Sequence, residues 1–279
     1  MTKTRPSLSN RLRCIADCVR AVAARYALPP RMADIGCDHG LVPADLIITG
    51  DIDHAVASDI REGPLQAARG NAERFGVSER MLFVCADGLG GIGQNAAEIC
   101  VITGMGGELI REILATADLR SAGIQYLVLS PHTKAAELRR YLRDAGFTLL
   151  SEIMAEEDDK TYPILTLSVL RTENREDAAK EKKNDCYQIC IDAIAKAAGY
   201  DRPDALRVAY AYGPVLLARR DAALKRFLLK QRERLANLLD EMKDHDADVR
   251  SLKRSLRDAC AALAVYREDA SERRHHAVQ

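Results

Sequence analysis

Acidic residues and glycines recur at the ends of short apolar segments, where they could bind a small ligand. Asp34-Ile35-Gly36 closes the first such segment, Asp59 closes the second, and Asp87-Gly88 follows the third. A fourth segment ends in Thr103–Gly107, a loop with three glycines. Glycine lets a ligand approach the backbone closely, and a carboxylate accepts hydrogen bonds from ribose hydroxyls. These residue types indicate a nucleoside-binding site.

The same glycines do not form a phosphate-binding loop. Gly36 and Gly40 lack the Gly-x-Gly-x-x-Gly spacing that holds a pyrophosphate at a helix N-terminus. Asp59 lies 23 residues after Gly36, as a ribose-binding acid does, and Asp87 is placed to meet an adenine edge. Adenosine recognition without a phosphate cradle fits S-adenosylmethionine. Asp59 or Asp87 alone could equally cap a turn, and the glycine loop could be a tight turn without a ligand.

Strands and helices alternate along the segment that must position these residues. An amphipathic pattern predicts a first helix over residues 8–27. Strands are predicted at 32–36, 55–59, 81–85, 99–103 and 126–129, with helices at 43–49, 64–75, 109–117 and 135–145. Two more strands, 147–154 and 164–170, follow without a helix between them and predict an antiparallel hairpin. The alternation predicts a doubly wound α/β fold whose seven-stranded sheet is mostly parallel.

The remainder of the chain has a helical pattern. Residues 171–185 carry ten charges and are predicted to be a linker or a solvated helix start, and residues 186–198 are predicted to form a helix that ends at Gly199. From Pro214 onward, apolar residues step by three and four in a heptad seam that runs through Leu235, Val249 and Leu263. A hairpin turning near residues 244–246 would bury its own seam, so it is favoured over one long helix. The predicted domains are 1–171, 172–213 (linker and helix) and 214–279 (all-α coiled-coil hairpin).

The overall charge is a cancellation between two parts of the chain. The 279 residues contain 41 Lys and Arg and 41 Asp and Glu, which argues against a general polyanion binder. Residues 202–279, however, hold 17 basic and 12 acidic residues, whereas residues 1–201 hold 24 basic and 29 acidic residues. The basic helical part could contact phosphates, or it could be a solvated coiled-coil surface.

Cysteine usage and hydropathy suggest a cytoplasmic protein. The eight cysteines include no Cys-x-x-Cys pair, so we expect buried thiols and no metal site. Residues 1–6 lack the apolar core of a signal peptide, and no segment reaches the roughly 18 apolar residues of a membrane span.

Taken together, the motifs resemble the bacterial family of tRNA (adenine-22-N1)-methyltransferases. The matching segments run in family order over about residues 8–266, nearly the whole chain. They are Leu8–Leu12, Ala33–His39, Glu62–Pro64, Asp87–Leu89, Ile102–Ile110, Leu138–Arg140, Glu157–Tyr162 and Tyr212–Pro214. The resemblance implies a Rossmann-like S-adenosylmethionine-dependent methyltransferase domain with a C-terminal coiled-coil domain, acting on N1 of adenine 22 in tRNA.

The resemblance also implies roles for individual residues. The implied cofactor-binding residues are Asp34, Gly36, Asp38, His39, Asp59, Asp87, Gly88, Gly104 and Met105. The implied substrate-binding residues are Arg11, Gly106, Gly107, His132 and Tyr162. The family often has Ser where Cys37 stands and an amide residue where this chain has Pro131-His132, so the side chain that reads the target base is left open.

The chemistry requires little of the protein beyond placement. Adenine N1 is already nucleophilic, so the enzyme must expose it, hold it and exclude water. Asp38 is the first candidate for a group that takes the N6 proton, although it could instead orient the cofactor amine. His39 could orient the base or only hydrogen-bond its loop. We expect a monomer that binds tRNA and does not bind a membrane. The alternatives are a methyltransferase for a small molecule or protein and a non-catalytic scaffold.

Overall fold

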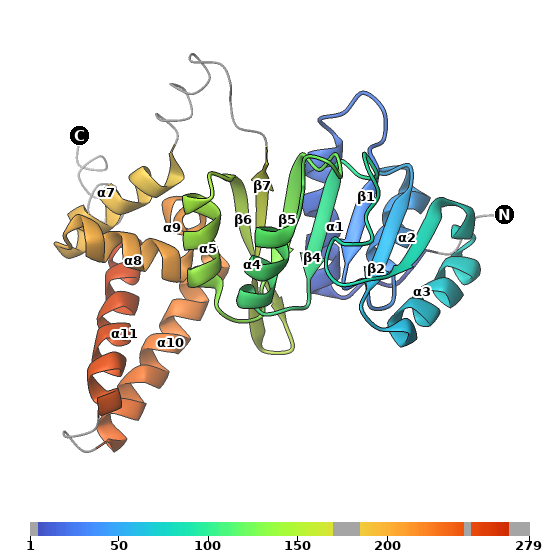
Figure 1. The fold of residues 1–279 in the computed structure, drawn as a ribbon. Helices are drawn as coiled ribbons and strands as arrows, with labels where there is room; N and C mark the ends of the chain where they lie inside the picture. Colours follow the sequence, from blue (N-terminus) through green and yellow to red (C-terminus); the bar gives the residue numbers. More distant parts are fainter. Residues whose placement is uncertain (1–4, 170–184, 243–246, 268–279) are drawn as a thin grey trace, which may run out of the picture. The chain divides into compact units, whose positions relative to one another are not determined.

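The computed structural model describes residues 5–169, 185–242 and 247–267. The chain divides into two compact units, Met1–Arg171 and Thr172–Gln279, which Figure 1 shows in blue to green and in yellow to red. None of the helices in the described ranges is long and apolar enough to cross a membrane.

The first unit is a doubly wound α/β domain built on one seven-stranded sheet in the order β3-β2-β1-β4-β5-β7-β6. The strands are β1 (Met32–Ile35), β2 (Ala55–Asp59), β3 (Met81–Cys85), β4 (Ile99–Thr103), β5 (Tyr126–Ser130), β6 (Thr148–Glu157) and β7 (Lys160–Ser168). The first five pair in parallel, and β7 is antiparallel to both β5 and β6. The predicted fold class is confirmed.

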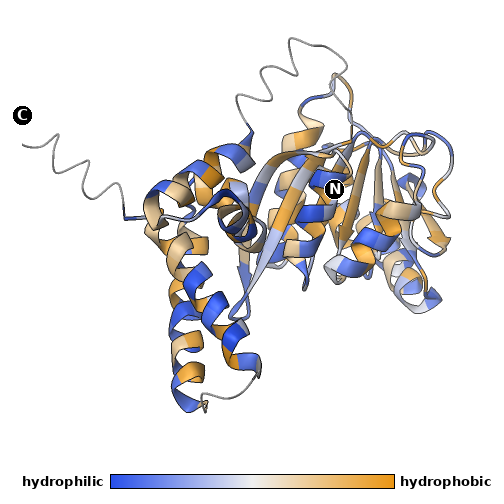
Figure 2. Ribbon diagram, turned by 60° about the vertical axis from the view of Figure 1, so that its left-hand side comes forward, coloured by the Kyte–Doolittle hydropathy of each residue, from blue (hydrophilic) through white to orange (hydrophobic). Residues whose placement is uncertain are grey.

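Helices cover both faces of this sheet because successive strand residues point to opposite sides. Ile99 and Val101 of β4 belong to the core under α1 (Asn10–Ala23), α2 (Leu41–Thr49) and α3 (Glu62–Phe75). Cys100 and Ile102 belong to the core under α4 (Gly107–Thr116) and α5 (Ala135–Asp144). In Figure 2 the inner strands are accordingly mostly hydrophobic along their length, whereas the helices are mixed.

Local signals explain most element boundaries. The Ser9 side chain accepts a hydrogen bond from the Leu12 N–H and caps α1, and Gly76 ends α3 in the left-handed conformation at φ 68°. The main difference from prediction is the β6–β7 hairpin. The sequence predicts strands at 147–154 and 164–170, but β6 continues through Glu156 and Glu157 and the chain turns only at Asp158-Asp159, both of which have positive φ.

Helix α1 is fixed to α2 through one buried carboxylate. Asp45 of α2 is almost completely buried, and its Oδ1 accepts hydrogen bonds from Arg5 Nε and Nη2 at 2.9 and 2.8 Å. Its Oδ2 accepts a hydrogen bond from Arg20, near the end of α1. Since α1 also carries Arg11, this network sets the position of one candidate site residue.

The second unit consists of five helices within the described residues. They are α7 (Cys186–Ala198), α8 (Arg202–Tyr212), α9 (Pro214–Ala218), α10 (Ala222–Glu241) and α11 (Ala247–Ala264). The predicted helix with its stop at Gly199 is confirmed. A bidentate ion pair between Arg207 of α8 and the buried Asp258 of α11 ties these two helices together.

The C-terminal heptad seam is divided between separate helices. Helix α10 ends at Glu241, and Met242 is extended, so one continuous helix is excluded. Helices α10 and α11 pack against each other, with Leu224, Leu228 and Leu235 buried on α10. Leu238, three positions after Leu235 in the same heptad pattern, is 36% exposed, and Leu217, which would extend the pattern backwards, lies in α9. The predicted turn at residues 244–246 lies outside the described residues.

Replacing Asp45 should destabilise the protein strongly. In Asp45→Ala, Arg20 and Arg5 both lose their buried acceptor, so we expect the free energy of unfolding to fall by about 3 kcal/mol in urea titrations. The matched control is Asp17→Ala, which removes the exposed partner of the same Arg20 and should cost less than about 0.5 kcal/mol. Equal losses for the two variants would contradict the assigned role of Asp45.

Candidate functional site

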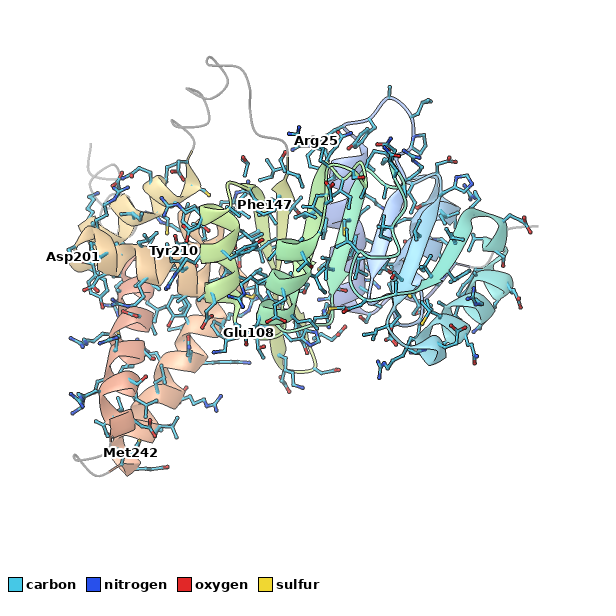
Figure 3. The ribbon with its side chains drawn as sticks, viewed as in Figure 1. Arg25, Glu108, Phe147, Asp201, Tyr210 and Met242 are labelled. Atoms are coloured by element: carbon cyan, nitrogen blue, oxygen red, sulfur yellow. The ribbon has the colours of Figure 1, made fainter. Side chains whose placement is uncertain are left out.

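The carboxyl ends of the parallel strands border a cavity of about 620 Å³. It lies between the adjacent strands β1 and β4. At this point the order in which successive strands are added to the sheet changes direction, which is where ligands bind in such folds. Glu108, labelled in Figure 3, is the second residue of α4 and marks the end of the sheet at which β4 terminates.

Most residues singled out from the sequence line this cavity. They are Arg11, Asp34, Gly36, Asp38, His39, Asp59, Asp87, Gly88, Gly104, Met105 and His132. Gly106, Gly107 and Tyr162 are not among the lining residues. The strand ends therefore bring together side chains that are up to 121 positions apart in the sequence.

The loop after β1 is held in an unusual backbone conformation. Gly36, Asp38 and Gly40 have φ values of 73°, 48° and 62°. The N–H groups of Gly36 and Cys37 both donate to the Ser58 carbonyl, which ties this loop to β2. The positive φ of Gly36 favours glycine, whereas a Cβ there would meet only the flexible end of the Met105 side chain, 2.3 Å from its Cε. Such strain is typical of functional loops.

The side chains of this loop point toward solvent at the cavity. Asp38 and His39 are 74% and 58% exposed, and the distance from His39 Nε2 to Asp38 Oδ1 is 3.6 Å. The His39 carbonyl accepts a hydrogen bond from Asn71 of α3. Both side chains are therefore accessible to a ligand.

The glycine-rich loop after β4 has two different parts. Gly104 and Met105 face the cavity, whereas Gly106 and Gly107 pack against the loop after β5. A Cβ on Gly107 would lie 2.6 Å from the Lys134 carbonyl oxygen, and the Gly107 N–H donates to the Thr133 carbonyl. The last two glycines thus allow two loops to approach each other closely.

This contact between loops also places His132. The His132 N–H donates to the Met105 carbonyl at 2.8 Å, so the residue after Pro131 is brought to the cavity rim. Its ring packs against the Tyr162 ring with centroids 5.2 Å apart, and the Arg11 guanidinium lies 4.7 Å from the centroid of the same Tyr162 ring.

The acidic residues of the cavity repel one another. Asp34 is almost completely buried, and burial, followed by the charges of Asp38 and Asp59, raises its pKa to about 7. Asp59 Oδ1 accepts a hydrogen bond from the Arg61 N–H at 2.9 Å. The turn-capping contact considered from the sequence is therefore present, but it uses one oxygen only and does not exclude a ligand on the other.

The thiols near the site are not reactive groups. Burial raises the pKa of both Cys37 and Cys100, so neither thiol ionises near neutral pH. In the described part of the chain no group of three His, Cys, Asp or Glu residues could hold a metal ion.

Sequence reasoning missed the apolar walls of the cavity. Ile60 and Leu109 are exposed hydrophobic residues that line it, and Ile113 approaches Gly88. Ile60 directly follows the acid of β2, a position that could have been singled out. Ile113 could not have been, because it lies on the apolar stripe of α4, where helical periodicity indicates a core residue.

Comparison with known proteins identifies the class. The chain belongs to the methyltransferase-domain family, whose model matches residues 8–165. Within that class it is 32% identical over 158 residues to the tRNA (adenine(22)-N(1))-methyltransferase of Bacillus subtilis strain 168. That alignment covers 57% of this chain and 63% of the relative, so the chain matches a little less than two thirds of the relative's length. The resemblance predicted from the sequence is confirmed.

Solved structures share the fold over nearly the whole chain. The crystal structure of the B. subtilis m1A22 tRNA methyltransferase aligns with a TM-score of 0.70 and 21% identity, covering 92% of this chain and 99% of that one. The M. capricolum TrmK structure, in complex with the cofactor product S-adenosylhomocysteine, aligns with a TM-score of 0.68 and 18% identity. It covers 93% of this chain and 99% of that chain.

The buried Asp34 should make the protein less stable as the pH rises. The pKa of this carboxyl is about 7 in the folded chain, against an ordinary value of 3.8, so the folded state holds the extra proton. Its stabilising contribution is complete below pH 4 and is lost as pH rises to about 7, by up to about 1.4 kcal/mol per pH unit.

Asp34→Asn should therefore remove this dependence, so that the variant gains stability relative to wild type between about pH 5 and pH 8 in thermal or urea unfolding. Asp144→Asn, which alters an exposed carboxylate at the end of α5, should follow the wild-type profile. Parallel curves for wild type and Asp34→Asn would show that Asp34 does not titrate in this range.

Proposed function

We propose that this protein is an S-adenosylmethionine-dependent methyltransferase that modifies N1 of adenine 22 in tRNA. The observation that carries the proposal is the cavity at the ends of β1 to β4, which is lined by Asp59, Asp87 and three glycines and has no phosphate-binding loop. The similarity to the B. subtilis enzyme supports the acceptor. We also propose that the protein acts as a monomer in the cytoplasm, where tRNA is found.

The residues of the cavity fit this cofactor. Asp59 keeps an oxygen for the ribose hydroxyls, while Gly88 and Ile113 leave a narrow apolar slot beside Asp87 for the adenine. Gly36 provides backbone without a side chain, and Asp34, Asp38 and His39 would border the methionine end, where carboxylates complement an ammonium group.

When bound, S-adenosylmethionine supplies a methyl group on a positively charged sulfur. The protein itself positions the two substrates and supplies charged groups that complement the cofactor. The acids surround the cationic end, and the two packed loops after β4 and β5 hold the acceptor side of the cavity in a fixed position. The apolar side chains of Ile60, Leu109 and Ile113 reduce the access of water.

The helical unit is proposed to bind the tRNA backbone. Exposed basic residues occur on both helices of the α10–α11 pair, and four of them form no ion pair within the described residues: Lys230, Arg234, Arg250 and Arg254. Phosphate contacts provide most of the affinity of such proteins for nucleic acid.

The decisive experiment is methylation of unmodified tRNA. Radioactive S-adenosylmethionine should label a transcript with adenine at position 22, and nucleoside analysis should give 1-methyladenosine. The matched transcript with guanine at position 22 should stay unlabelled. Equal labelling of both transcripts would reject the site assignment, and no labelling of either, with methylation of a small molecule or protein instead, would favour the alternative class of acceptor.

Neutralising the helical basic residues should weaken tRNA binding alone. We expect Lys230→Gln combined with Arg234→Gln to reduce tRNA affinity severalfold at low salt. The slope of log K against log salt should become shallower by about 2, one unit for each lost phosphate contact. Affinity for S-adenosylmethionine, measured by calorimetry, should not change.

The matched control is the pair Arg74→Gln and Arg120→Gln, two exposed arginines of the first unit that change the net charge equally. If both double variants lose the same affinity, the effect reflects net charge and not contacts on α10.

A further inference from the structure

The cavity has two chemically different sides. Asp34, Asp38, Asp59 and Asp87, from the ends of β1, β2 and β3, make one side acidic, since they outnumber Arg61, the exposed cation that lies 3.9 Å from Asp59 there. The other side is made by Arg11 of α1 and His132 of the loop after β5, next to Gly104. The acidic side suits a cation with ribose hydroxyls. An anionic group of a ligand is expected on the side of the cavity that Arg11 lines.

Arg11 is held as a cation with unused hydrogen-bonding capacity. Its Nε is buried and has no hydrogen-bond partner among the described residues. The guanidinium is fixed over the Tyr162 ring, and Nη2 is 4.0 Å from where a Cβ on Gly104 would lie. Burial lowers the pKa of Arg11, with opposing effects from Tyr162 and Glu157, yet an arginine remains charged. A planar cation with open donors beside a cavity fits a phosphate.

His132 contacts the same assembly. Its ring leans on Tyr162, and its backbone is fixed by the hydrogen bond to Met105. The charged groups that face it are Arg11 from α1 and Lys160 from β7. Burial, then Arg11, then Lys160 lower the pKa of His132, so the imidazole is neutral at pH 7.

The neighbouring charges around this assembly have partners of their own. A carboxylate oxygen of Glu157, in β6, accepts a hydrogen bond from the Arg11 backbone N–H at 3.3 Å. Lys134, in the loop that carries His132, pairs with Glu137 at 3.6 Å. Neither Lys134 nor Lys160 lines the cavity, so the Arg11 guanidinium is the cation that this side of the cavity presents to a ligand.

Resting on the proposed methylation of tRNA, we infer that Arg11, Tyr162 and His132 form the wall that holds the target nucleotide. Arg11 binds a phosphate of that nucleotide, Tyr162 supports both neighbours, and the imidazole of His132 contacts the edge of the base. The acidic wall then remains for the cofactor, and the two ligands meet beside Gly104 and Met105.

The charge state of the imidazole matters for the reaction. Methylation at N1 places a positive charge on the adenine ring, and a protonated imidazole at its edge would oppose that charge. Arg11 therefore has two effects: it anchors the nucleotide through the phosphate, and its charge adds to burial in lowering the pKa of His132. If Arg11 lowers the pKa of His132 in this way, replacing it changes the pH dependence of the rate. Replacing an arginine with only a structural role would leave the pH dependence unchanged.

Steady-state kinetics with unmodified tRNA test the inference. Arg11→Gln should raise KM for tRNA about tenfold or more, because a charge-assisted phosphate contact is lost, while the Kd for S-adenosylmethionine stays within about twofold of wild type. In wild type the acid limb of the kcat–pH profile should lie at the lower pH, because Arg11 lowers the pKa of His132. In Arg11→Gln the acid limb should move to higher pH, since His132 then protonates more easily. Arg11→Lys retains the charge, so the acid limb should stay in place although KM rises. In His132→Asn the acid limb should disappear.

Arg13→Gln is the matched control, because Arg13 is an exposed arginine on the same helix that does not line the cavity. It should behave as wild type in KM and in the pH profile. Thermal melting and cofactor affinity of each variant report whether it is folded.

The inference is overturned if wild type methylates adenine 22 and Arg11→Gln retains both its KM and its acid limb. It is also overturned if His132→Asn keeps the wild-type pH profile. A wild-type protein that binds S-adenosylmethionine but leaves adenine 22 unmodified gives a different result, which rejects the proposed function itself.

Discussion

The parallel pairing of β1 with β4 is the constraint on which the site depends. These two central strands lead into connections on opposite faces of the sheet, with α2 after β1 packed in one core and α4 after β4 packed in the other. Their carboxyl ends are therefore left uncovered side by side, and the loops that follow them must turn away from each other. The positive φ values of Gly36, Asp38 and Gly40 in one loop and of Gly104 in the other are where the two loops turn away from the strand ends.

The electrostatics of the cavity follow from which strand end supplies which residue. Acids come from β1, β2 and β3 on one side of the gap, and a cation and an uncharged imidazole come from α1 and the β5 loop on the other. Burial, followed by the charges of Asp38 and Asp59, raises the pKa of Asp34, so the acids are held together at an energetic cost. A cationic ligand relieves that repulsion. An anionic ligand on the acidic side would add to it, so the two walls select different partners.

The sheet could be predicted from the sequence because each strand has a clear boundary. β2, β3 and β4 begin and end where the apolar runs do, since Asp59, Gly88 and Gly104 interrupt them. The β6–β7 hairpin was harder. Its acidic residues are polar enough to indicate a loop, but cross-strand pairing with Lys160 and Thr161 extends the strands almost to the turn. The α9 helix was missed because its apolar residues merge into the heptad seam, which the left-handed Arg220 interrupts. The α8 helix precedes that seam and lies in the part predicted as a linker and one helix.

The candidate site shows where sequence information ends. Motif spacing could indicate Asp34, Asp59 and Gly36, because those residues lie at the ends of strands. It could not indicate that Gly107 is needed for a loop contact while Gly104 faces the cavity, since both are glycines in one motif. Nor could it bring together Arg11, His132 and Tyr162, which come from α1, the β5 loop and β7. That assembly depends on Asp45 fixing α1 and on Met105 fixing the β5 loop, so the nucleotide side of the cavity is set by packing between elements and not by any one motif.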